Sequence, residues 1–274
     1  MTKDELFKLL DKAIANISDK YFCDEEREML TYQLKDANLP FLYSVESGIS
    51  KAVILIEGLS YVVKIPFNSF YNDDAYNDAH YEWEEQYDNI AANKALSEEE
   101  RQQLLLEHSR CEPDGGDDQF YYPLEGATYC ALDALKDAPD WNYCNLECAI
   151  YEEAVKQGLG AYFAEEGLLG NLSCDYPIYY QQRCTPLCSL ELNYYGEEYE
   201  IKSKRARTTC EKYNMDCFNP YWINDFIDAY GEDELRRLNE FIKEMDIGDL
   251  RECNIGYLDN APILFDYSGF RYWD

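Results

Sequence analysis

The chain has 274 residues, 46% hydrophobic and 15% aromatic, and its 55 acidic against 24 basic residues give a net charge of −31. This length allows one large domain or two modest ones with a sizeable core, and the aromatic content excludes a disordered chain. No uncharged apolar stretch reaches the ~18 residues that span a bilayer, and no export signal is visible at the N-terminus. We therefore expect a folded, cytoplasmic protein.

The acidic charge disfavours two classes of partner. Proteins bind nucleic acids mainly through basic residues that neutralise phosphates, and anionic membranes attract basic residues too. We therefore predict neither direct nucleic-acid binding nor membrane binding. Two interpretations of the charge stay open: a solvated surface, and a nucleic-acid mimic that binds a basic protein partner, such as an inhibitor encoded by a mobile element.

The 11 cysteines and two histidines do not form a recognisable metal motif. Cys144 with Cys148, and Cys184 with Cys188, stand four residues apart, which is not the spacing of zinc sites. In a reducing compartment we expect free thiols, and we expect them to be buried and chemically inert.

Residues 1–38 are predicted to form a helical extension. Thr2 and Glu5 match a capping box, and apolar residues recur at helical spacing as far as Ile17. A second helix is predicted over 25–35.

Three short strands are predicted next, over 41–43, 52–56 and 61–65. A turn around Gly48 separates the first two, and Glu57-Gly58 separates the second from the third. This pattern predicts an antiparallel sheet with one covered face.

Residues 68–140 are predicted to be an acidic insertion between this sheet and the elements that follow. They are rich in Tyr, Asn and Asp. One convincing helix is predicted there, from Ser97 to His108, because Ser97 and Glu100 stand at capping-box spacing.

The remaining chain alternates helical and extended patterns. Residues 146–165 are predicted to be helical, with a break possible at Gly158 and Gly160, and 177–181 to be a strand. A long amphipathic helix is predicted over 221–245, which Gly231 can split.

One basic cluster interrupts the acidic sequence, formed by Lys202, Lys204, Arg205 and Arg207. We expect a solvated loop there; the alternative is a segment that grips a phosphate or an acidic partner.

Polar residues near the C-terminal end have the composition of a magnesium site. Asp249 and Asn254 lie five residues apart, and a hairpin follows and ends at Asp266. Mg²⁺ prefers oxygen ligands and is usually held by one or two carboxylates together with substrate phosphates. Lys64, within an apolar strand, needs a charged partner if it is buried.

These segments resemble the protein-kinase-like superfamily, over about residues 41–67 and 146–270. Asp249-Leu250-Arg251-Glu252-Cys253-Asn254 is similar to the catalytic-loop motif D-L-K-x-x-N, and Asp266-Tyr267-Ser268-Gly269 is similar to D-F-G with one residue inserted. Lys64 matches the nucleotide lysine of the third strand, and Gly48-x-x-Lys51-x-Val53 resembles the end of the Gly-rich loop.

The resemblance implies a set of roles. Lys64, oriented by Glu147 (or by Glu152 or Glu153), would hold the α- and β-phosphates of ATP, which Gly48 and Lys51 would cover. Asn254 and Asp266 would bind Mg²⁺, and Asp249 would act on the acceptor hydroxyl. Gln181, Arg183 and Cys184 fall where the chain would contact adenine.

The resemblance also implies a fold. It is an α+β, protein-kinase-like two-lobed fold with an antiparallel N-lobe sheet and a minimal helical C-lobe. The domains would be the extension 1–38, an N-lobe over 39–184 that contains the insertion, and a truncated C-lobe over 185–274.

The sequence departs from the kinase pattern in two places. Ile247-Gly248 replaces the usual His-Arg before Asp249, and the sequence stops eight residues after Asp266, so we expect no activation segment. Each site residue taken alone also has a structural explanation, such as an edge-strand lysine or a turn aspartate. Three functions stay open: an ATP- and Mg²⁺-dependent phosphotransferase with an unknown acceptor, a pseudokinase that serves as an interaction protein, and the acidic mimic.

Overall fold

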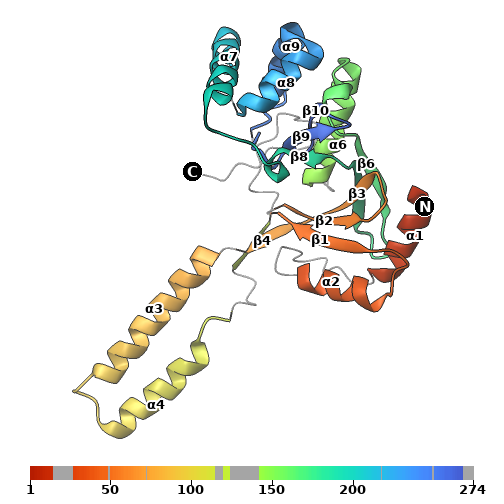
Figure 1. Cartoon of the computed structure of the whole chain (residues 1–274). Coiled ribbons are helices and arrows are strands. Elements are labelled where there is room, and N and C mark those ends of the chain that lie inside the picture. The colour runs from red at the N-terminus through yellow and green to blue at the C-terminus, as the bar shows by residue number, and fades with distance from the viewer. Residues whose placement is uncertain are drawn as a thin grey trace.

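A computed structural model describes residues 1–14, 27–48, 50–71, 73–114, 120–123, 142–216, 218–248 and 250–267. This described part is an α+β structure with eight α-helices, a five-stranded antiparallel sheet and a three-stranded antiparallel sheet (Figure 1). The helices are α1 (Lys3–Ala13), α2 (Arg27–Asp36), α3 (Asp73–Ala92), α4 (Glu98–His108), α6 (Tyr143–Lys156), α7 (Glu197–Tyr213), α8 (Pro220–Tyr230) and α9 (Glu232–Glu244).

The larger sheet has the strand order β1-β2-β3-β7-β6. Its strands are β1 (Tyr43–Ser47), β2 (Lys51–Ile56), β3 (Tyr61–Pro66), β6 (Glu166–Asn171) and β7 (Pro177–Gln182). The predicted second, third and 177–181 strands are confirmed, whereas the first strand begins at Tyr43 and not at Phe41. β6 was not predicted, because no element was assigned between Glu165 and Pro177.

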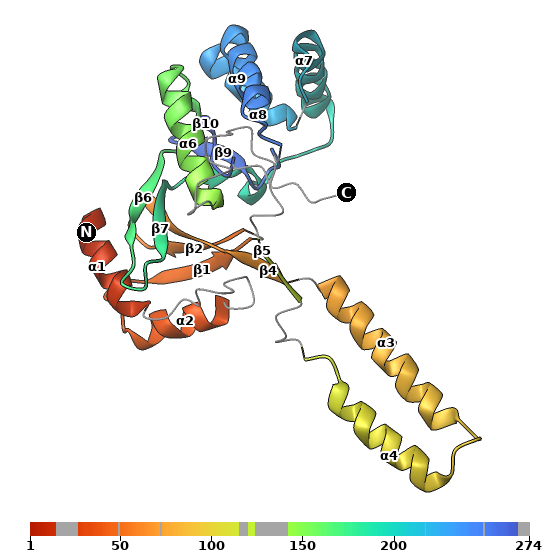
Figure 2. The same ribbon diagram turned by 180° about the vertical axis from the view of Figure 1, so that it is seen from behind.

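Helices α1 and α2 cover the face of this sheet that points away from the rest of the molecule (Figures 1 and 2). Leu6 and Leu10 of α1 pack with Leu30 and Leu34 of α2 against alternate buried residues of β2 and β3. The predicted capping box is confirmed, since the Glu5 amide donates to Thr2 Oγ1 and the Thr2 amide donates to Glu5 Oε2. Ile17 and residues 25–26 of the predicted helices lie outside the described residues.

Helices α3 and α4 form a hairpin that projects away from the body (Figures 1 and 2). α4 begins where predicted, with Ser97 as its N-cap and Glu100 completing a capping box. The 20-residue α3 was missed, because its sequence was interpreted as irregular. Across the hairpin, the Trp83 ring stacks on the His108 ring at 5.3 Å. We call this hairpin the arm; none of its side chains whose burial is described is buried.

A second hydrophobic core lies among α6, α7, α8, α9 and the smaller sheet. That sheet has the order β10-β9-β8 and consists of β8 (Thr185–Pro186), β9 (Ile255–Leu258) and β10 (Ala261–Leu264). A pair of strands, β4 (Ser69–Tyr71) and β5 (Tyr121–Pro123), lies at the base of the arm. α6 joins the two cores, because Tyr143 packs in the first and Ile150 in the second.

Glycines and caps set the ends of the helices in the second core. The predicted 221–245 helix is split at Gly231, whose φ of 92° favours glycine. The predicted 146–165 helix ends at Lys156, before Gly158 at φ 74°. The basic cluster lies on α7, which corrects the expected loop; there Arg205 pairs with Asp228 at 2.7 Å. Among the described helices, none has both the length and the apolar character of a membrane span.

Candidate functional site

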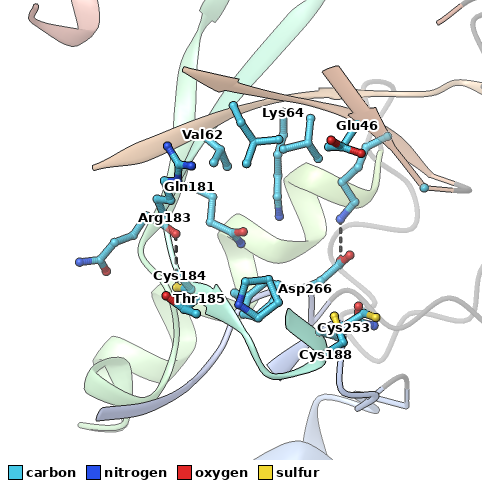
Figure 3. A pocket seen from close by; sticks show the side chains of 18 of the residues that line it. Glu46, Val62, Lys64, Gln181, Arg183, Cys184, Thr185, Cys188, Cys253 and Asp266 are labelled. Carbon is cyan, nitrogen blue, oxygen red and sulfur yellow. Dashed lines mark hydrogen bonds and ion pairs between the residues drawn. The ribbon is translucent and has the colours of Figure 1, made fainter. Parts of the chain in front are cut away.

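A cavity of about 870 Å³ lies between the larger sheet and the smaller sheet. Its walls come from β2 and β3, from the connection 181–188 and from the turn 251–254 with the residues that follow β10. Figure 3 shows Lys64 pointing into this space from the sheet and Asp266 approaching from the opposite side. Segments distant in sequence therefore contribute to one cavity.

Strand periodicity places the polar residues of the sheet on its cavity face. Val53 pairs with Lys64 across β2 and β3, so Lys51, two residues before Val53, projects from the same face. Gln181 of β7 pairs with Val62 on one side and with Glu166 of β6 on the other. Two lysines, a glutamine and a glutamate therefore share the cavity face of the sheet, together with Glu46 of β1, which lies opposite Val53.

Glu147 of α6 binds both lysines. Lys64 Nζ lies 2.8 Å from Glu147 Oε2, and Lys51 Nζ lies 2.8 Å from Glu147 Oε1. Lys64 Nζ also lies 3.0 Å from Glu166 Oε2, which accepts a hydrogen bond from Gln181 Nε2 at 2.5 Å. Lys51 Nζ lies 2.8 Å from Asp266 Oδ1. We call Lys51, Lys64, Glu147, Glu166 and Asp266 the ion-pair network.

The charges of the ion-pair network sustain one another despite burial. Burial disfavours the charged form of both lysines. The negative charges of Asp266 and Glu147 outweigh this effect at Lys51, and those of Glu147 and Glu166 outweigh it at Lys64. The pKa of each lysine is therefore raised. Burial opposes ionisation of Glu147 too, yet the two ammoniums hold its pKa well below the usual range. Burial and the charge of Glu147 raise the pKa of Glu166 well above its ordinary value.

Asp266 is the open end of the ion-pair network. Its side chain is 39% exposed, against 4% for Lys51 and 0% for Glu147. Asn254 lines the same cavity. A carboxylate and an amide oxygen at an open cavity are ligands of the kind that Mg²⁺ accepts, so the donor set fits that ion.

A second group of candidate ligands, formed by Cys144, Glu147 and Glu166, lies deeper. Their ligand atoms are within 4.8 Å of one another and all three residues are buried. Ammonium groups already pair with both carboxylates, and burial raises the pKa of the Cys144 thiol well above its usual value. A metal would need the thiolate, so this group acts as part of the salt-bridged interior.

The other predicted site residues can be placed as follows. Gly48 lies in the β1–β2 turn and lines the cavity, and its amide donates to the Lys51 carbonyl at 3.0 Å. Arg183 and Cys184 line the cavity, with Arg183 Nη1 donating to the Ile56 carbonyl at 3.2 Å. Burial raises the pKa of Cys184 to about 12.

The remaining candidates are Asp249 and the two alternative glutamates, Glu152 and Glu153. Asp249 lies outside the described residues, as do Ser268 and Gly269 of the D-F-G-like motif. Glu152 is exposed, and Glu153 pairs with Lys156 at 3.2 Å, so neither of the alternative glutamates partners Lys64.

Sequence reasoning missed two features of the site. Glu166 was assigned no role, because no element was predicted between the 146–165 helix and the 177–181 strand. Lys51 was expected only to cover phosphates from the turn, yet it is the lysine that contacts Asp266. Its spacing from Val53 was the available signal, since alternate strand residues share a face.

The raised pKa of Glu166 predicts a pH effect on stability. Between its ordinary pKa near 4.5 and the raised value, the folded state holds a proton that the unfolded state releases. The contribution of this proton to the stability of the folded state is therefore fully present below the ordinary pKa of Glu166. It is lost as the pH rises through the raised pKa of the folded state. Glu166→Gln, which is neutral at every pH, should gain stability relative to the unmodified chain as pH rises, as measured by urea unfolding between pH 5 and 8. Glu165→Gln is the matched control, and a constant Glu166→Gln difference across this range would contradict the assignment.

The chain was also compared with known proteins. No protein-family model, curated protein or solved structure gives a significant match. The interpretation of the site therefore depends on its own geometry and chemistry.

Proposed function

We propose that the chain is a kinase-like phosphotransferase that binds a nucleoside triphosphate and Mg²⁺ in the cavity. The architecture supports this: an antiparallel sheet and a mainly helical unit have separate cores and enclose the cavity between them. A two-lobed kinase-like fold requires such an arrangement, with the nucleotide between the lobes.

The ion-pair network is the observation that carries the proposal. In protein kinases, a lysine on the third strand pairs with a glutamate on a helix, and an aspartate after a hairpin holds the metal. Here Lys64 of β3 pairs with Glu147 of α6, and Asp266 follows the β9–β10 hairpin. Lys51 contacts both Glu147 and Asp266, and Asp266 lies 215 positions after Lys51 in the sequence.

The surroundings of the two lysines suggest that they have different roles. Lys64 contacts two carboxylates that are both fully buried, so its main role is to hold Glu147 and the sheet in place. Lys51 contacts the exposed Asp266 at the cavity and is better placed to bind phosphate oxygens. Asp266 and Asn254 would hold Mg²⁺, which neutralises charge on the transferred phosphoryl group when bound.

A pseudokinase that binds nucleotide without turnover is the second candidate. Ile247-Gly248 before Asp249 favours it, because the residues that normally support the catalytic loop are replaced. Asp249 distinguishes the two functions, since only a phosphotransferase needs a group that orients or deprotonates the acceptor hydroxyl.

Calorimetric titration of the full chain with ATP, with and without Mg²⁺, tests binding. We expect Mg²⁺-dependent binding, weakened about tenfold or more by Asp266→Asn, because interactions with charged groups contribute about 1.5–3 kcal/mol. Asp259→Asn, in the exposed β9–β10 turn, is the control and should bind normally.

No heat of binding with any nucleotide would reject both candidates. If ATP binds, transfer of labelled γ-phosphate that Asp249→Asn abolishes supports the phosphotransferase. Binding with no transfer or hydrolysis supports the pseudokinase.

A further inference from the structure

Two exposed cysteines meet at the rim of the cavity. Cys188 belongs to the 3₁₀ turn η6 (Leu187–Ser189), and Cys253 to the turn before β9. Both line the cavity, and Figure 3 shows their side chains adjacent to one another. Burial and the neighbouring Cys253 thiol raise the pKa of Cys188 to about 11. These residues differ from the buried, inert thiols that we expected from the sequence.

The backbone around the pair explains why the two thiols meet. β8 pairs antiparallel with β9, with Pro186 opposite Gly256, so the residues after Pro186 run alongside those before Gly256. The Cys188 amide donates to the Glu252 carbonyl at 3.0 Å, which holds η6 against the turn before β9. A Cβ on Gly256 would lie 2.1 Å from the Thr185 carbonyl oxygen, so glycine is required for this close approach.

We propose that Cys188 and Cys253 are a redox modification site, at which a peroxide converts the two thiols into a disulfide. One thiol reduces the peroxide, becomes a sulfenic acid and releases one water when the oxidant is hydrogen peroxide. The sulfur of the second thiol then attacks the sulfenic sulfur. The S–S bond forms, and the hydroxyl leaves with the thiol proton as a second water.

The disulfide would alter the cavity. An S–S bond of about 2.05 Å is much shorter than a contact between two thiols, so its formation pulls the 251–254 turn toward η6. Asn254 lies in that turn and would move relative to Asp266. This consequence rests on the proposed function, and we expect oxidised protein to bind Mg²⁺–ATP several-fold more weakly than reduced protein.

Peptide mapping of the full chain after stoichiometric hydrogen peroxide tests the site itself. We expect one dominant cross-linked peptide that joins Cys188 to Cys253, has lost two hydrogen atoms, and is reversed by dithiothreitol. Cys253→Ser should abolish it, whereas Cys111→Ser, which removes an exposed cysteine in the turn after α4, should leave it intact.

Two results would overturn the proposal. One is oxidation of Cys253 to the sulfinic acid without cross-linking; the other is a dominant Cys184–Cys188 disulfide, since Cys184 is the other cysteine near the rim. ATP titration of the oxidised and reduced forms separates the two proposals. A disulfide that forms in a chain with no affinity for nucleotide leaves the redox site standing and rejects the proposed function.

Discussion

Replacing Glu147 with glutamine is expected to lower the free energy of unfolding by about 3–5 kcal/mol, the usual cost of removing one partner from a buried ion pair. Glu147 is fully buried and is the only residue that contacts both Lys51 and Lys64 among the ion pairs described. Glutamine keeps the volume but turns an amide donor toward one of the two ammoniums. That ammonium then loses an acceptor in a largely buried environment.

Urea unfolding at pH 7 measures this loss, with Glu153→Gln as the matched control. Glu153 lies on the same helix, and its ion pair with Lys156 is at the surface, so little change is expected there. A loss below about 1 kcal/mol for Glu147→Gln, in the range of surface ion pairs, would mean that Glu147 does not hold the lysines in solution.

Replacing Lys51 with methionine is expected to weaken Mg²⁺–ATP binding by about 10- to 100-fold, the range that a lost hydrogen bond to a charged group implies. The cost in stability should be smaller than for Glu147→Gln. Asp266 would lose its ammonium but remain 39% exposed to solvent, and Glu147 would keep Lys64.

Calorimetric titration with ATP and urea unfolding of the same variant separate the two effects. Lys156→Met, at the exposed end of α6, is the control for removing a positive charge. Unchanged affinity together with a large loss of stability would assign Lys51 a purely structural role and leave phosphate binding to other residues.

The sequence predicts much of the fold, because local patterns determine many elements. The capping boxes at Thr2 and Ser97 and the glycine at 231 mark helix ends through chemistry that acts within a few residues. β6 and α3 were missed for opposite reasons. The Gly-Leu-Leu-Gly segment of β6 has no alternation, so its pairing with β7 decides its structure. In contrast, α3 carries an aromatic face at helical spacing, formed by Tyr76, His80, Trp83 and Tyr87, and this signal was overlooked among the acidic residues.

The site was predictable in its parts but not in its connections. The ion pair between Lys64 and Glu147 was expected, and the structure contains it at 2.8 Å. The position of Lys51 between Glu147 and Asp266 depends on which face of β2 meets the cavity and on where α6 crosses the sheet. The pairing of Cys188 with Cys253 likewise follows from the β8–β9 register, which no spacing in the sequence indicates.

The arm carries part of the strong negative charge of the chain. Residues 73–112 carry 12 carboxylates and three basic side chains, so they hold −9 of the total of −31. A 20-residue helix is about 30 Å long, several times the screening length of about 8 Å at physiological salt. Because the arm points outward (Figures 1 and 2), nearly a third of the charge excess is set apart from the cavity. A polyanionic ligand entering the cavity would therefore meet only a faint repulsion from the arm.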